Sequence, residues 1–122
     1  MAAGLTGGPP FSEAVTMAAV RNLFAASPGS PGVETIDMLF ENPAFTLEHI
    51  VSRGAASPEG FWYDQPRDEW VLLLRGEAEI GYESGETIPM TAGDSLLIPA
   101  HCRHRVERTS GDAIWLALHF DC

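Results

Sequence analysis

The chain contains no lysine, so its positive charge comes from seven arginines, which face seventeen acidic residues. The resulting formal net charge of −10 repels the phosphate backbone of nucleic acids and the surface of anionic lipids. We therefore expect neither a nucleic acid nor a membrane as partner.

Long apolar runs are also missing. No run reaches the roughly 18–20 residues of a membrane-spanning helix, and the N-terminus lacks the basic region that opens a secretory signal. These absences predict a soluble, cytoplasmic protein. Cysteine is scarce too, and Cys102 and Cys122 are expected to be free thiols in such a reducing compartment.

The domain organisation follows from length and composition. A chain of 122 residues suffices for one domain with its own core. Residues 1–20 begin with a stretch rich in glycine, alanine and proline and are predicted to form a flexible extension, and residues 21–122 the domain itself. Apolar spacing from Ser12 to Ala26 indicates a short helix or helical turn near this boundary.

From Val33 onward, apolar residues recur with a period of two, which is the period of a β-strand. Many short strands separated by turn residues, with no alternation of strands and helices, favour an antiparallel barrel or sandwich. The fold class is therefore predicted to be all-β. The expected strands are Glu34 to Phe40, Phe45 to Arg53, Phe61 to Gln65, Glu69 to Leu74, Glu77 to Tyr82, Glu86 to Met90, Ser95 to Ile98, Arg103 to Arg108 and Ala113 to Phe120.

Two polar residues interrupt these apolar patterns. Alternation places Glu69 on the same strand face as Val71 and Leu73, and it places His104 on the same face as Val106. If the apolar residues face the interior, a carboxylate and an imidazole face it too. A buried carboxylate must be paired, hydrogen-bonded or bound to a cation, so the two residues predict either a structural pair or a metal site.

The spacings Glu69-x6-Gly76 and Gly93-x5-Pro99-x4-His104 resemble the two sequence boxes of the cupin superfamily. The wider similarity is to small bacterial single-domain cupins, and it covers nearly the whole chain after the extension. The resemblance implies an antiparallel double-stranded β-helix, the jelly-roll barrel of cupins, often assembled as a homodimer. It also implies a metal site in the barrel, although cupins include binders as well as enzymes.

The chain departs from the usual cupin ligand set of three histidines and one glutamate. The two histidine positions of the first box fall on Tyr63 and Gln65, or on Trp62 and Asp64, depending on the register. His101 stands where the second box has a glycine. The candidate metal ligands are therefore Glu69, His101, His104, Asp64 and Gln65.

This mixture of imidazole and oxygen donors suits Fe, Mn, Ni or Zn. Residues three apart on a straight strand face opposite sides, so His101 can join His104 only if the segment after Pro99 turns. Tyr63 and Asp64 are also candidate catalytic residues, as ligands or proton carriers.

Several neighbouring residues have two readings. Phe61 and Trp62 form a wall of the substrate pocket or plug the end of the barrel. His49 and His119 are interpreted as structural histidines. A homodimer is expected, because exposed apolar edges such as the strand Ala113 to Phe120 would gain from pairing.

Two functions remain open. One is a metal-dependent enzyme, an oxygenase or isomerase, that acts on a small organic substrate. The other is a non-catalytic cupin that binds a sugar or another small effector without an essential metal. The fold alone does not choose between them.

Overall fold

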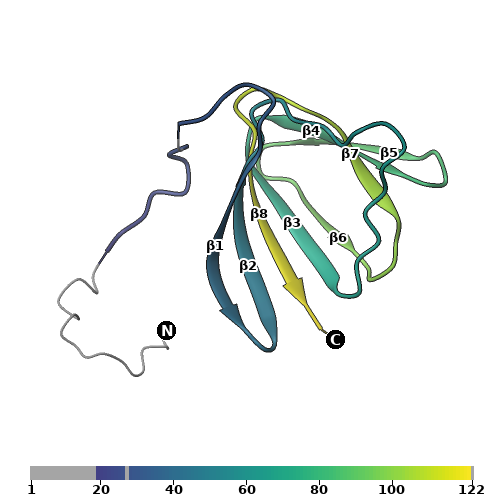
Figure 1. Cartoon of the computed structure of the whole chain (residues 1–122), viewed down its shortest axis with the longest axis horizontal. Coiled ribbons are helices and arrows are strands. Elements are labelled where there is room, and N and C mark those ends of the chain that lie inside the picture. Colours follow the sequence, from purple (N-terminus) through teal and green to yellow (C-terminus); the bar gives the residue numbers. More distant parts are fainter. Residues whose placement is uncertain (1–18, 27, 122) are drawn as a thin grey trace.

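A computed structural model of the chain describes residues 19–26 and 28–121, and Figure 1 shows them as a barrel of strands with the N-terminal segment at one side. The described residues contain strands and turns and no helix. The all-β prediction is confirmed. The strands are β1 (Thr35–Asn42), β2 (Phe45–Val51), β3 (Asp68–Arg75), β4 (Glu77–Tyr82), β5 (Thr87–Thr91), β6 (Ser95–Ile98), β7 (His104–Thr109) and β8 (Ile114–Phe120).

The strands form two antiparallel sheets. One sheet has five strands in the order β1-β2-β8-β3-β6, and the other has three in the order β5-β4-β7. Apolar side chains from both sheets meet between them, with Leu73, Ala78 and Trp115 at the centre of the packing. This is the jelly-roll arrangement that the cupin resemblance implied.

The glycines of the two boxes sit at turns that require them. Gly76 and Gly93 have φ angles of 86° and 94°, which side chains rarely adopt. At Gly76 a Cβ would also lie 2.9 Å from the Cα of Ala113. These turns start β4 and β6 in the correct register, so the spacing of the motif has a backbone explanation.

One expected strand is absent. The segment Phe61 to Gln65 forms only a single bridge, in which the Tyr63 amide donates to the His104 carbonyl at 2.7 Å. The physical reason is that Pro58, Gly60 and Pro66 surround the segment, and proline cannot donate to a ladder. The segment therefore runs as a loop past the start of β7.

The expectation of an exposed edge at Ala113 to Phe120 was wrong. β8 pairs with β2 on one side and with β3 on the other, so it lies within the sheet. The edge of this sheet nearest the N-terminus is β1, whose side chains Ile36, Met38 and Phe40 are exposed.

The expected helix from Ser12 to Ala26 lies mostly outside the described residues. Residues 19–26, which we call the N-terminal strap, contain a turn closed by the Ala25 amide and the Asn22 carbonyl at 3.1 Å. The Asn22 side chain accepts from the Phe24 amide at 2.9 Å, a local bond that competes with helix formation. Within the described part of the chain no helix is long and apolar enough to cross a membrane.

Candidate functional site

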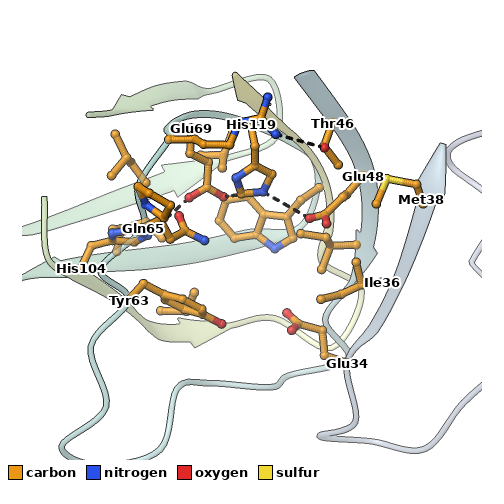
Figure 2. Close-up of a pocket in the computed structure, with 18 residues that line it drawn as sticks. Glu34, Ile36, Met38, Thr46, Glu48, Tyr63, Gln65, Glu69, His104 and His119 are labelled. Atoms are coloured by element: carbon orange, nitrogen blue, oxygen red, sulfur yellow. Dashed lines mark hydrogen bonds and ion pairs between the residues drawn. The ribbon is translucent and has the colours of Figure 1, made fainter. Parts of the chain in front are cut away.

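A cavity of about 490 Å³ opens at one end of the barrel. Its wall combines aliphatic side chains from both sheets with a group of polar side chains, shown in Figure 2. The ionisable and amide side chains of the wall are Glu34, Glu48, Tyr63, Gln65, Arg67, Glu69, His104 and His119. This polar group at the end of an apolar barrel is the candidate site.

Strand β3 places Glu69 in the cavity. Glu69, Val71 and Leu73 are all buried, with Glu69 9% exposed, as their alternation predicted. The Oε1 atom of Glu69 is buried and has no hydrogen-bond donor among the described residues. A buried carboxylate oxygen without a donor is costly, so this atom points to a missing partner.

His104 begins β7 and faces the same cavity, with 4% of its surface exposed. Its Nδ1 atom donates to the Cys102 carbonyl at 2.9 Å, which leaves Nε2 turned toward Glu69 Oε1 at 3.5 Å. The Tyr63 ring stacks on the imidazole at a centroid distance of 5.3 Å and holds its plane. The ring is therefore oriented by two contacts and has one nitrogen directed at the cavity.

The protonation of His104 reflects opposing influences. Burial lowers its pKa, but the interactions with Glu69 and with the Cys102 carbonyl outweigh burial and raise the pKa above its ordinary value. The 3.5 Å separation of Nε2 and Oε1 is long for a hydrogen bond, so we regard the contact with Glu69 mainly as charge attraction.

His119 is a site residue that the sequence interpretation missed. Its Nε2 atom lies 3.3 Å from Glu48 Oε1 and 3.8 Å from Glu69 Oε2. Residues His119 and Glu69 are directly paired between β8 and β3. The sequence did contain a hint, because His119 lies four residues after Trp115 on the same strand and therefore on the same face, and Trp115 also lines the cavity.

Glu48 and Glu34 were missed as well. Glu48 shares the inward face of β2 with Thr46 and Ile50, and Glu34, directly before β1, also lines the cavity. Partial burial and the charge of Glu48 both raise the pKa of Glu34. Burial also raises the pKa of Tyr63, helped by the nearby carboxylates, so its phenol remains a proton donor in the cavity.

The structure separates two candidate ligands from the cavity. His101 Nδ1 lies 2.9 Å from Asp64 Oδ1, and the two side chains are 69% and 49% exposed. The segment after Pro99 does turn, with His101 at a φ of 61° in the place of the cupin glycine. The turn directs the imidazole to Asp64, and neither residue lines the cavity. Of the predicted ligands, Glu69, His104 and Gln65 share the cavity.

The predicted aromatic wall is also divided. Tyr63 lines the cavity, whereas Phe61 and Trp62 do not. Phe61 packs edge-on against Tyr63 at a centroid distance of 4.8 Å, and the Arg105 guanidinium lies 6.0 Å from the Trp62 ring. Phe61 therefore supports a cavity residue from behind.

No three histidine, cysteine, aspartate or glutamate side chains gather as a metal site in residues 19–26 and 28–121. The nearest combination is His104 with Glu69, to which Gln65 adds an amide oxygen from the same cavity. Gln65 Oε1 is buried and, like Glu69 Oε1, lacks a hydrogen-bond donor. The cavity thus holds two buried oxygens without hydrogen-bond donors, and the Nε2 atom of His104 faces one of them.

Known proteins resemble this chain in sequence and structure. A crystal structure from Ralstonia eutropha JMP134, described as a candidate mannose-6-phosphate isomerase, is 45% identical, with a TM-score of 0.79 over 85% of this chain and 99% of that one. A cupin superfamily protein from Desulfitobacterium hafniense DCB-2 is 18% identical, with a TM-score of 0.67 over 79% and 84% of the two chains, and it shows the fold alone.

Sequence comparison gives the family. The uncharacterized protein YdbB of Bacillus subtilis is 37% identical over 59 residues, which are 48% of this chain and 52% of YdbB. The match thus spans about half the length of that curated relative. The model of the cupin domain family matches residues 48–119, more than half of the chain. The chain is a small single-domain member of the cupin superfamily.

Proposed function

We propose that this cupin binds a divalent transition metal in the barrel and acts as an isomerase-type enzyme on a small organic substrate. The observation that carries the proposal is the set of unsatisfied acceptors. Glu69 Oε1 and Gln65 Oε1 are buried without donors, and His104 Nε2 faces the same carboxylate. Two buried oxygens without donors, beside an imidazole nitrogen that binds metal when it is deprotonated, fit a cation, and imidazole with oxygen donors suits Fe, Mn, Ni or Zn.

The bound metal would supply polarisation of a substrate oxygen. The chain's own residues would position the substrate and move protons. His104 is held by the Cys102 carbonyl and by Tyr63, so its orientation does not depend on the substrate. A histidine that ligates a metal is usually held in place in this way by hydrogen bonds and packing.

Proton transfer falls to His119 and Glu48, which the sequence did not assign, and to Tyr63, which it did. His119 contacts Glu48 at 3.3 Å, an acid–base pair within the cavity wall. Tyr63 carries a phenol in the same cavity, which keeps it as a candidate proton donor, while Asp64 lies outside. Since isomerisation needs proton removal and return, these groups favour the isomerase over the oxygenase. The 45% identical relative described as a candidate isomerase supports the same choice.

A non-catalytic binding cupin is the second candidate, and the same unsatisfied oxygens favour it. The hydroxyl groups of a sugar or another effector would donate to Glu69 Oε1 and Gln65 Oε1 without a metal. The cavity is large enough for such a molecule, with aliphatic walls to contact its carbon frame. The two candidates therefore differ in the need for a metal.

Metal analysis of untagged protein separates them. The protein is purified without an affinity tag, stripped with a chelator, reloaded separately with Fe, Mn, Ni and Zn, desalted and measured by mass spectrometry. We expect near-stoichiometric retention in the wild type and its loss in Glu69→Ala and His104→Ala. His101→Asn serves as the matched control, since this histidine lies outside the cavity. Protein that retains none of the four metals overturns the enzyme proposal and leaves the metal-free binder.

The assembly is a separate proposal. We propose a homodimer that covers β1, because this edge strand exposes Ile36, Met38 and Phe40 and leaves one side of its backbone unpaired. Two of these residues also line the cavity, so a second copy would help to enclose it. Native mass spectrometry of the wild type and of Met38→Glu tests this, and a monomeric wild type would contradict it. The cytoplasmic location likewise stays a prediction.

A further inference from the structure

The charged side chains of the cavity wall are mostly acidic. Glu34, Glu48 and Glu69 contribute carboxylates, and Arg67 contributes the one guanidinium among the described lining residues. Glu34 directly precedes β1, and Glu48 lies on the inward face of β2. Two carboxylates that line the cavity, Glu34 and Glu48, are therefore not among the proposed metal ligands.

The charge of Arg67 is partly balanced by its ion pair with Asp121, at the end of the sheet opposite Glu34. Its Nε atom donates to Asp121 Oδ1 at 3.2 Å, and Nη2 donates to the Ala44 carbonyl at 2.8 Å. Nη1 contacts Thr46 Oγ1 at 3.4 Å. These contacts use three of the five N–H groups of the guanidinium, whereas an arginine arranged to clamp a phosphate directs a pair of its N–H groups at the ligand.

A second observation is that two buried acceptor oxygens in the cavity have no hydrogen-bond donor. Glu69 is 9% exposed, and its Oε1 atom faces the cavity without a hydrogen-bond donor. Gln65 Oε1 is in the same condition. These unpartnered oxygens belong to other residues than Glu34 and Glu48. In the metal-free protein, both observations favour a ligand that brings N–H or O–H groups.

The carboxylates of Glu34 and Glu48 are close enough for the charge of one to affect the pKa of the other. Burial raises the pKa of Glu34, and the charge of Glu48 adds to the rise, as expected where two carboxylates line one cavity. An ammonium or hydroxyl group placed there would relieve the repulsion, whereas a phosphate would increase it. In the same cavity, Ile50, Val71 and Trp115 offer apolar surface for the carbon frame of the ligand.

We propose that Glu34 and Glu48 determine the charge specificity of the cavity, which takes small hydroxylated or amine-bearing molecules and rejects phosphorylated ones. The inference rests on the proposed small-molecule function and deepens it. It also separates this chain from the phosphorylated substrate in the description of its 45% identical relative.

The test uses one molecular frame with three charges. Mannose, mannosamine and mannose 6-phosphate are titrated into the wild type by calorimetry, with thermal shift as a second readout. We expect mannose and mannosamine to bind, and mannose 6-phosphate to bind at least about tenfold more weakly, since two carboxylates act on its charge. The relative affinities of mannose and mannosamine show whether hydroxyl groups or a cation are preferred.

The double variant Glu34→Gln/Glu48→Gln assigns the effect to these residues. We expect its affinity for mannose 6-phosphate to rise by about tenfold relative to that for mannose, because the repulsion is removed and the side-chain size is kept. Glu59→Gln is the matched control, as Glu59 is exposed and does not line the cavity. Circular dichroism and the melting temperature verify that the variants are folded.

The outcomes are distinct. Preferential binding of mannose 6-phosphate by the wild type overturns the proposal, and so does a ratio that the double variant leaves unchanged. Failure of all three sugars to bind overturns the assignment of hydroxylated and amine-bearing ligands. Every titration is run on metal-loaded and on chelator-treated protein with the metal content measured. The measured metal content tests the proposed metal site, and the sugar affinities test the charge preference, so failure of one can be distinguished from failure of the other.

Discussion

His49 and His104 are almost equally buried, at 1% and 4% exposure, yet they lie on opposite sides of the barrel wall and have different surroundings. His49 is on the outer face of β2, under the N-terminal strap. Its Nε2 atom donates to the Leu23 carbonyl at 2.7 Å, and its Nδ1 atom accepts from Arg21 at 3.3 Å. Both nitrogens of His49 are therefore satisfied within the chain.

His104 is only half satisfied. Its Nδ1 atom is bonded to the Cys102 carbonyl, while Nε2 faces a carboxylate oxygen that has no hydrogen-bond donor. The contrast shows that burial alone does not distinguish a structural histidine from a functional one. What distinguishes them is whether the protein completes the hydrogen bonding of the ring and of its neighbours.

The largest effect should follow from removing the satisfied histidine. His49→Ala leaves a cavity beneath the strap and deprives the Leu23 carbonyl of its donor. We expect the free energy of unfolding to fall by about 2–4 kcal/mol, with little change in the affinity for metal. Urea denaturation of chelator-treated protein measures the loss.

The matched control for His49→Ala is His101→Asn. His101 is exposed and has a positive φ that asparagine tolerates well, so its replacement should leave the stability nearly unchanged. Equal losses in the two variants would show that the strap contributes nothing through His49.

The sequence could predict most of the fold because alternation and turn residues determine it locally. The turn at Asn42 and the glycine at Gly76 mark strand ends correctly, because each satisfies a local backbone requirement. The neighbours of β8 could not be obtained in the same way. A period of two describes the faces of a strand but not its position in a sheet, so an apolar strand within the sheet was taken for an edge.

Site residues could be predicted only on strands where the alternation of apolar residues shows which face is inward. Glu69 and His104 face the cavity because their strands continue inward-facing apolar patterns. His101 could not be placed by this argument, since it lies in a turn whose φ of 61° directs its ring to Asp64. His119 had the correct parity, but its partner Glu48 comes from a strand more than sixty residues earlier. Such contacts depend on the strand order.

The incomplete hydrogen bonding around His104 predicts that neutralising Glu69 makes the metal-free protein more stable. In Glu69→Gln a buried carboxylate with a donor-free oxygen becomes a neutral amide that can donate to His104 Nε2. At about pH 8.5, roughly two units above the ordinary histidine pKa, we expect the chelator-treated variant to be more stable by about 1 kcal/mol. It should also bind metal more weakly.

Glu59→Gln provides the reference for the Glu69→Gln measurement, because it removes the same charge from an exposed position. A clear loss of stability in Glu69→Gln would mean that the carboxylate is already satisfied without a ligand, and the comparison of the two histidines would fail.

A smaller effect is expected in the pH dependence of the chelator-treated protein. The folded protein raises the pKa of His104 above its unfolded value of about 6.5. A raised histidine pKa gives stability that is fully present below pH 6.5 and is lost as the pH rises through the folded value. Urea denaturation across this range should show a steeper decline in the wild type than in His104→Gln. Parallel curves would contradict the contribution of His104.

The smallest effect on stability should come from removing the exposed ion pair between the N-terminal strap and β1. Arg21 pairs with Asp37 at 3.0 Å and donates to His49, but the side chains of the ion pair are 47% and 42% exposed. Solvent and salt screen such a pair, so Arg21→Gln should lower the free energy of unfolding by no more than about 0.5 kcal/mol. Glutamine retains an amide that can still donate to His49. A loss as large as that of His49→Ala would mean that Arg21, rather than the Leu23 carbonyl, holds the buried histidine. Denaturation at low and high salt separates these cases, because only the ion-pair contribution declines with salt.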